Sequence, residues 1–318
     1  MGTEFYAGLD LGGTFLKYAL GTAAGKIVKK GKKPSRADET QEQVFGVMFE
    51  AIDELQKEAQ RRQGELKAIG VGSPGAIDFD KGRLIGSTPN IACWANADIR
   101  GKIRDKFHLP VWADNDANIM AFAESRQGAA KGYRNVLCTT LGTGIGGGIL
   151  IDGELYRGTN YAGTEIGHMM IVHDGIPCNC GGRGCFEKYA SAPAMVQHYV
   201  NLLNESGKKA PKNVSTVTIF QKAAAGQAEA IAAIEITLAY LGTGFASLVN
   251  IFNPEILVVG GGVADAGDDF IARIQKAIAK RAMKPALKGF KVVRAVLGNE
   301  AGFVGGIRLA AEMFLKSR

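Results

Sequence analysis

Short apolar stretches bounded by glycine turns open the chain, which is the pattern of β-strands. Residues 4–10 form one such stretch, a glycine turn follows at 11–14, and residues 15–20 return as a second strand. A third strand is expected at 26–30. Over residues 40–62 the apolar spacing becomes that of one helix face. The chain therefore opens with three strands and a helix.

A similar arrangement recurs in the middle of the chain. Short strands are expected at 68–72 and 111–113, and a helix follows from residue 117 onward. Three further strands come next, joined by a glycine turn and a tight Asp-Gly turn, at 135–141, 146–151 and 154–156. This repeat is one of architecture rather than of residues. It predicts two related α/β domains with a cleft between them.

The last third of the chain predicts helices around one buried strand. Residues 221–250 are typical of a long alanine-rich helix with a break near Gly226. A buried strand is expected at 254–259, a helix at 266–280 and a closing amphipathic helix at 303–317. Strands that alternate with helices in this way indicate the α/β class.

Length and composition agree with this organisation. At 318 residues the chain exceeds the usual size of one domain, which favours two. A hydrophobic content of 46% and a charged content of 22% are ordinary for globular proteins, so disorder is excluded. No uninterrupted apolar run has the length of a membrane span, and the N-terminus lacks a signal-peptide pattern. With no disulfide scaffold, we expect a cytoplasmic protein with no membrane partner.

The net charge of +7 comes in large part from one lysine-rich stretch, at Lys26, Lys29, Lys30, Lys32 and Lys33. A nucleic-acid patch is one interpretation, but no aromatic residues alternate with these lysines to stack on bases. A hairpin edge protected from aggregation by lysine is favoured instead. We therefore expect no nucleic-acid partner, and the positive charge suits an anionic small molecule.

Three of the five cysteines lie close together, at Cys178, Cys180 and Cys185. With one imidazole they would complete a tetrahedral shell for structural Zn²⁺, and His168 and His173 are both candidates for that ligand. The alternative is a disulfide between Cys185 and one neighbour, which would leave a thiol unpaired. We favour zinc. Glu165 and Glu187 flank the cluster, so the metal would stiffen a loop that presents two acids.

Three glycine turns each follow a predicted strand, at 12–13, 142–148 and 260–262. Such turns let backbone N–H groups approach phosphate oxygens, and the third is expected to lead into a helix N-terminus. Each alone is equally well a tight hairpin, but together they favour a nucleotide. Residues 142–147 also fit the G-x-G-x-x-G pattern, which we reject because a strand rather than a helix follows.

Two aspartates stand at ends of predicted strands. Asp10 lies beside the first glycine turn, where it can hold Mg²⁺ while Thr14 or Lys17 meets a phosphate; the alternative is a turn residue that bonds its own backbone. Asn115 and Asp116 follow another strand and open a helix. Asp116 can be a helix cap, but ligands of open α/β sheets bind at the carboxyl ends of strands.

The chain resembles the ROK family of sugar kinases over nearly its whole length. The pieces that carry the resemblance are Asp10-Leu11-Gly12-Gly13-Thr14, Ser73-Pro74-Gly75, Thr88-Pro89-Asn90, Asn115-Asp116-Ala117-Asn118, Leu141-Gly142-Thr143-Gly144-Ile145-Gly146, Glu165-Ile166-Gly167-His168, the cysteine cluster through Glu187, and Gly260-Gly261-Gly262. The resemblance implies an actin-like, ribonuclease-H-like ATPase fold with an interdomain cleft and a structural zinc loop. One domain would comprise residues 1–118 and 303–318, and the other residues 119–302.

The resemblance also implies an activity and its residues. The reaction would be ATP-dependent phosphorylation of a hexose, glucose first, with Asp116 as the general base. The sugar would be bound by Gly75, Asn90, Asn115, Glu165, His168 and Glu187. ATP and Mg²⁺ would be held by Asp10, Gly12, Gly13, Thr14, Lys17, Thr143, Gly144, Gly261 and Gly262. The ligands of the structural Zn²⁺ would be His168, Cys178, Cys180 and Cys185.

Other activities found in the family are the alternatives to a glucose kinase. N-acetylmannosamine, N-acetylglucosamine and fructose kinases are the nearest, because Asn, Glu and His side chains suit any of these sugars. A sugar-responsive repressor is remote, because such proteins carry an added helix-turn-helix segment and here the first strand begins by Glu4. Trp94 stands where members often have glycines, and we expect it in the core. Resemblance further implies a homodimer or homotetramer.

Overall fold

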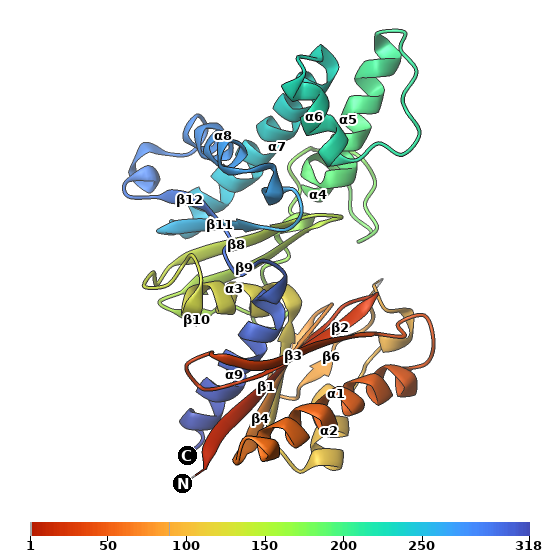
Figure 1. The fold of residues 1–318 in the computed structure, drawn as a ribbon. Helices are drawn as coiled ribbons and strands as arrows, with labels where there is room; N and C mark the ends of the chain where they lie inside the picture. Colours follow the sequence, from red (N-terminus) through yellow and green to blue (C-terminus); the bar gives the residue numbers. More distant parts are fainter. Residues whose placement is uncertain (1, 89) are drawn as a thin grey trace. The chain divides into compact units, whose positions relative to one another are not determined.

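The computed structural model describes residues 2–88 and 90–318, which fold into two compact units (Figure 1). Unit 1 comprises Met1–Gly132, Leu155–Gly163 and Val296–Arg318. Unit 2 comprises Tyr133–Glu154 and Thr164–Ala295. Pro89 of the Thr88-Pro89-Asn90 motif lies outside the described residues.

The sequence placed the domain boundaries at residues 118 and 303. In the structure the first stretch of unit 1 continues to Gly132, and its last stretch already begins at Val296. The physical reason is Glu124, a buried carboxylate that accepts three backbone N–H bonds. Its donors are Ala129 at 2.7 Å, Val296 at 3.1 Å and Leu297 at 2.9 Å. Glu124 therefore holds both the chain that leaves unit 1 and the chain that returns to it.

Unit 1 contains a five-stranded sheet in the order β3-β2-β1-β4-β7. Its strands are β1 (Thr3–Leu11), β2 (Phe15–Gly21), β3 (Ile27–Pro34), β4 (Gly64–Ser73) and β7 (Val111–Asn115). The hairpin pairs β1/β2 and β2/β3 are antiparallel, whereas β1/β4 and β4/β7 are parallel. The lysine-rich strand β3 is an edge strand, which confirms the favoured interpretation of that charge.

Alternation along the central strands assigns their two faces. Ala7 and Leu9 of β1 join the core beneath α1 (Gln41–Arg61) and α2 (Ile99–Phe107). Gly8 points to the opposite face, which α9 (Ala301–Lys316) covers (Figure 1). Helix α3 (Asp116–Gln127) packs against α9, and the two-stranded sheet of β5 (Ile77–Asp78) and β6 (Arg83–Leu84) completes unit 1.

Trp94 belongs to the core of unit 1, as the sequence predicted. Its side chain is fully buried, and its indole Nε1–H donates to Ser73 Oγ at 3.0 Å. Its ring lies 4.7 Å from that of Phe45, centroid to centroid. The indole therefore packs between α1 and the sheet with its polar atom satisfied.

Unit 2 repeats this sheet topology, in the order β10-β9-β8-β11-β12. Its strands are β8 (Val136–Leu141), β9 (Ile145–Ile151), β10 (Glu154–Leu155), β11 (Ile256–Gly260) and β12 (Lys291–Arg294). As in unit 1, the first hairpin is antiparallel, and parallel strands follow on the other side of its first strand. The predicted architectural repeat is therefore confirmed.

Helices of unit 2 bury one core against its sheet (Figure 1). They are α4 (Glu187–Ala190), α5 (Ala192–Glu205), α6 (Thr216–Ala224), α7 (Ala228–Phe252) and α8 (Asp268–Ala279). The predicted break near Gly226 is confirmed, because Gly226 has a φ of +84° between α6 and α7. By length and apolarity alone α7 could cross a membrane, but Leu241 and Phe245 lie fully buried in this core.

One expected connection differs. Gly262 does not lead directly into α8, because a 3₁₀ turn at Ala264–Ala266 and Gly267 intervene. Helix α8 then begins with Asp268 and Asp269, which complement its own N-terminal dipole. The third glycine turn therefore has no long helix N-terminus behind it.

The close approach of α9 to the sheet yields a stability prediction. A Cβ on Gly70 would lie 2.0 Å from the carbonyl oxygen of Gly306, whereas a Cβ on Gly46 in α1 would meet nothing within 4 Å. We expect Gly70→Ala to lower the free energy of unfolding by about 1–3 kcal/mol through overpacking. Gly46→Ala should raise it by about 0.5–1 kcal/mol. Urea unfolding measures both, and equal midpoints for the two variants would contradict this packing.

Candidate functional site

The turn from β7 to α3 carries the candidate base. Asn115 is the N-cap of α3, since its Oδ1 accepts N–H bonds from Ala117 at 2.8 Å and Asn118 at 3.2 Å. Its Nδ2 donates to the carbonyl of Gly75 at 3.0 Å. Asp116 is half-buried and is the first residue of the helix, with Oδ1 2.8 Å from the N–H of Ala117. The cap role considered for Asp116 therefore belongs to its neighbour.

The first glycine hairpin lies in the same unit. Asp10 pairs with Lys17 across β1 and β2, and Lys17 Nζ lies 3.6 Å from Asp10 Oδ2. A Cβ on Gly302 would lie 2.2 Å from Asp10 Cγ, so the first turn of α9 sits directly on this carboxylate. A Cβ on Gly13 would lie 2.8 Å from the carbonyl of Asn90. Unit 1 thus brings the predicted phosphate turn and Asn90 together.

Burial controls the chemistry of Asp10. Its side chain keeps 21% of its surface exposed, and burial raises the pKa of this carboxyl, while the neighbouring Lys17 opposes that rise. A carboxylate beside the predicted phosphate turn is a ligand type that Mg²⁺ accepts, and a bound cation would favour its ionised form. The alternative of a turn residue is not supported, because Asp10 lies within β1 and pairs across the hairpin.

Unit 2 brings the other two glycine turns next to each other, and one of them lies against Glu187. A Cβ on Gly144 would lie 2.8 Å from Glu187 Oε2, and one on Gly261 would lie 2.4 Å from the carbonyl of Leu141. The N–H of Ala192 at the start of α5 donates to the carbonyl of Gly142 at 2.9 Å. Two predicted phosphate turns and one predicted sugar ligand are therefore neighbours within this unit.

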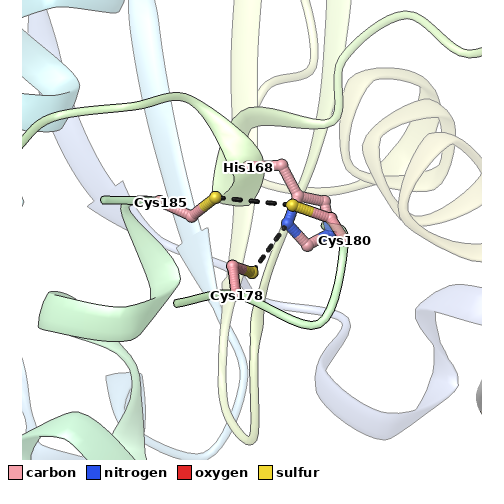
Figure 2. A group of neighbouring side chains, drawn as sticks. All are labelled: His168, Cys178, Cys180 and Cys185. Atoms are coloured by element: carbon pink, nitrogen blue, oxygen red, sulfur yellow. Dashed lines mark hydrogen bonds between the residues drawn. The ribbon is translucent and has the colours of Figure 1, made fainter. Parts of the chain in front are cut away.

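The cysteine cluster and one histidine converge in the same unit (Figure 2). The ligand atoms of His168, Cys178, Cys180 and Cys185 all lie within 4.8 Å of one another. His168 Nδ1 is 3.6 Å from Cys178 Sγ, and the Cys180 and Cys185 sulfurs are 3.5 Å apart. In a tetrahedral shell with bonds of about 2.0–2.3 Å, ligand atoms lie about 3.5–3.8 Å apart. These residues fit Zn²⁺.

Neither alternative for the cluster is supported. The cysteine residues are free thiols rather than a disulfide, and the His173 side chain is 97% exposed, outside the cluster. The N–H of Gly182 lowers the pKa of Cys180, whereas burial raises the pKa of Cys185 to about 12. Because metal ligands are thiolates, a bound Zn²⁺ would displace the proton of Cys185.

Cluster geometry also orients His168. Its Nδ1 faces the Cys178 sulfur, so Nε2 is the ring nitrogen without that contact (Figure 2). Glu187 Oε1 lies 3.6 Å from Cys178 Sγ, which joins the cluster to the residue beside Gly144. A metal on Nδ1 would fix the imidazole tautomer with its proton on Nε2.

The structure places the predicted sugar ligands in both units. Gly75, Asn90, Asn115 and Asp116 belong to unit 1, and Glu165, His168 and Glu187 belong to unit 2. Their joint action on one substrate stays a prediction. Sequence reasoning missed two further residues, Asp114 and Arg157, which form a buried ion pair beneath the β7–α3 turn. Asp114 directly precedes the quoted Asn115-Asp116-Ala117-Asn118 stretch, but no local pattern singled out Arg157.

Comparison with known proteins completes this picture. The ROK family profile matches residues 6–313. A glucokinase from Halalkalibacterium halodurans is 36% identical over 314 residues, covering 96% of this chain and 94% of that protein. The crystal structure of a ROK family glucokinase from Streptomyces griseus in complex with glucose and AMPPNP has a TM-score of 0.80 at 30% identity, covering 97% of this chain and 99% of that one. A xylose repressor from Caldicellulosiruptor bescii is 29% identical, covering 95% of this chain and 77% of the repressor.

Fold and site define the class first: a two-sheet, actin-like α/β protein with a His/Cys cluster that fits zinc. The match over nearly the whole length then decides the family. The chain belongs to the ROK family, and its glucokinase relatives are 31–36% identical to it.

Loss of one thiolate tests the metal cluster. We expect Cys180→Ser to reduce bound zinc from about one ion per chain to a small fraction, because three ligands hold Zn²⁺ far more weakly than four. The melting temperature should fall with it. Metal analysis by mass spectrometry measures the stoichiometry, with Cys93→Ser, outside the cluster, as the matched control. Active wild-type protein that contains no zinc would contradict the assignment.

Replacing Asp10 tests its burial. Because its folded-state pKa lies above the unfolded value, the folded state favours the protonated form, and its contribution to stability falls as pH rises through the folded pKa. We expect Asp10→Asn to be more stable than wild type at pH 7. The difference should shrink as pH falls and be nearly gone at about pH 3, where an unfolded aspartate, with a pKa of about 3.9, is also largely protonated. Urea unfolding midpoints of both proteins at the two pH values measure the difference. An Asp10→Asn variant that is less stable than wild type at pH 7 would contradict the prediction.

Proposed function

We propose that this protein transfers the γ-phosphoryl group of ATP to a hydroxyl of a hexose, most readily glucose, to give the 6-phosphate. The proposal makes Asp116 the general base. One observation carries it: Asn115, not Asp116, caps α3 at the carboxyl end of β7. The carboxylate of Asp116 accepts the N–H of Ala117 through Oδ1 but is not the N-cap, and it stands at the end of a strand where ligands of such sheets bind. The glucokinase relatives support the choice of reaction and sugar.

Phosphoryl transfer demands mainly positioning and charge stabilisation from the protein. In the proposal, Gly75, Asn90 and Asn115 of unit 1 bind sugar hydroxyls. Asn115 is well suited, because its capping oxygen and its bond to the Gly75 carbonyl fix the plane of its amide. One Nδ2 proton is then left to donate to a hydroxyl. Asp116, the next residue, would accept the proton of the hydroxyl that attacks the phosphorus.

Three residues of unit 2 would bind the same sugar. Glu165 and Glu187 would accept from hydroxyls, and His168 would donate through Nε2, because Nδ1 is the nitrogen that faces Cys178. Bound Zn²⁺ supplies rigidity to this loop and no other chemistry in the proposal. The protein's own part is to hold the acids and the imidazole still, since several fixed hydrogen bonds are needed to align a hydroxyl for in-line attack.

Nucleotide binding is assigned to the glycine turns. Asp10 would hold Mg²⁺, while Gly12, Gly13, Thr14 and Lys17 would meet phosphate oxygens. From unit 2, Thr143 and Gly144 would donate to phosphates, and Gly261 and Gly262 would line the adenosine. The short distance that a Gly144 Cβ would have to Glu187 supports neighbouring phosphate and sugar subsites in this unit.

A sugar panel tests the reaction. With ATP in a coupled assay of ADP release, we expect glucose to give the highest kcat/KM, ahead of fructose, N-acetylglucosamine and N-acetylmannosamine. Glucose carries a hydroxyl where the N-acetyl sugars carry an acetamido group, so a site that hydrogen-bonds that hydroxyl should disfavour the N-acetyl sugars by at least about tenfold, or 1.4 kcal/mol. Turnover of an N-acetyl sugar with none of glucose would replace the proposed substrate, and turnover of no sugar would reject the kinase.

Removal of the base tests its role. We expect Asp116→Asn to lower kcat by about 10²–10⁴-fold, because the amide cannot take the proton of the attacking hydroxyl. Sugar affinity, measured by calorimetry, should change little. Asp105→Asn, an exposed aspartate of α2, is the control and should keep wild-type rates. An Asp116→Asn enzyme with near-normal turnover would remove this residue from its proposed role.

A further inference from the structure

The segment Leu155–Gly163 makes an excursion from unit 2 into unit 1. It closes on itself, because the N–H of Gly163 donates to the carbonyl of Arg157 at 2.9 Å. Tyr161, with a φ of +58°, donates its hydroxyl to the carboxylate of Asp80. The chain returns to unit 2 at Thr164, directly before Glu165. The segment is therefore a compact loop that is fastened to unit 1 at two points.

Arg157 provides the second point. Its Nε donates to Asp114 Oδ2 at 2.7 Å, and its guanidinium carbon lies 3.8 Å from the centre of the Phe79 ring. The side chain of Asp114 is 1% exposed and that of Arg157 is 19% exposed. A planar guanidinium on an aromatic face, bonded to a buried carboxylate, has little freedom to move.

Asp114 in turn braces the start of α3. While Oδ2 accepts from Arg157, Oδ1 accepts from the backbone N–H of Asn115 at 2.8 Å and from Asn118 Nδ2 at 3.0 Å. These bonds fix the peptide between Asp114 and Asn115 and one side chain of the first helical turn. The side chains of Asn115 and Asp116 both project from the segment that Asp114 holds.

We propose that Arg157 is a positioning residue, which acts through Asp114 to fix the direction of Asn115 and Asp116. The proposal deepens the proposed function and rests on it. Without the Arg157 charge, Asp114 would be a buried carboxylate lacking its cation and would turn toward water or other donors. The β7–α3 turn would then lose its brace. A displacement of about 1 Å at the base is enough to cost roughly 10²-fold in rate.

A second arginine of unit 1 offers a matched control. Arg126 lies near the other end of α3, bonds Glu312 through Nε at 2.9 Å, and lies 4.4 Å from the centre of the Phe122 ring. Its side chain is 20% exposed, like that of Arg157. Loss of Arg126 should therefore cost similar stability without touching the turn. Comparing variants of the Arg157–Asp114 pair with variants of the Arg126–Glu312 pair therefore separates an effect on the position of the turn from a general loss of stability.

Five variants of the full chain test the proposal: Arg157→Met, Arg157→Lys, Asp114→Asn, Arg126→Met and the double variant Asp114→Asn/Arg157→Met. Each is assayed with glucose and ATP well below its own melting temperature. Hydrogen exchange of peptides that cover residues 113–119 reports on the turn without any need for turnover. The double variant removes both charges but keeps a side-chain oxygen for the N–H of Asn115, so it guards against failure of the single variant to fold.

We expect Arg157→Met to lower kcat by about 10–100-fold with the KM for ATP within about threefold, because the base is displaced while the nucleotide turns are not. Arg157→Lys should recover part of the rate, and Arg126→Met should stay within twofold of wild type. Because both residues act along one path, the double variant should be no slower than Arg157→Met. Exchange at residues 113–119 should be faster in Arg157→Met than in Arg126→Met.

The proposal is overturned if Arg157→Met and Arg126→Met show the same kcat, or the same exchange over residues 113–119. It is also overturned if the losses from Asp114→Asn and Arg157→Met simply multiply. These failures differ from failure of the proposed function, which would leave wild type itself without sugar phosphorylation. In that event the exchange measurement still decides whether Arg157 holds the turn.

Discussion

Direct contact between the backbone of α9 and two central strands is the constraint on which unit 1 depends. Gly8 of β1, Gly70 of β4 and Gly306 of α9 leave no room for a Cβ at this contact. With side chains there, the helix could not approach the strands this closely, because the added Cβ atoms would overlap backbone atoms. The first turn of α9 would then no longer rest on Asp10. The packing of one helix therefore also sets the desolvation of the carboxylate proposed to hold Mg²⁺.

The chemically important turns share a second property: each is held by a partner distant in sequence. Asn115 is tied to Gly75, Asp114 to Arg157, and Gly144 lies against Glu187, which in turn contacts Cys178. A turn alone would fluctuate among conformations, whereas phosphoryl transfer needs groups in fixed places before the substrate arrives. The tight cysteine cluster serves this purpose for the His168 loop, because a short loop rich in glycine has little hydrophobic surface with which to order itself.

Local chemistry made several features predictable from the sequence. The hairpins were recognisable because short apolar strands and glycine turns are patterns of a few residues, and their recurrence predicted the second sheet. Three cysteines within a short loop identified the metal cluster, since few other roles suit that spacing. The choice between His168 and His173 needed the family resemblance, and the structure agrees with it. Helix α2, helix α5 and strand β12 were not anticipated, because their short or irregular apolar patterns carry little signal outside their packing.

The sequence by itself determined the α/β class, the duplicated hairpin sheets, the break at Gly226, the core position of Trp94 and the residue types of the zinc cluster. These follow from period, turn chemistry and ligand spacing, which are properties of neighbours along the chain. Only the tertiary structure decided that Asn115 rather than Asp116 caps α3, that Glu124 holds both chain crossings, and that Arg157 reaches Asp114. Each of these depends on hydrogen bonds between segments separated by tens of residues or on the backbone geometry of one turn, and no local pattern encodes which donor a buried carboxylate will meet.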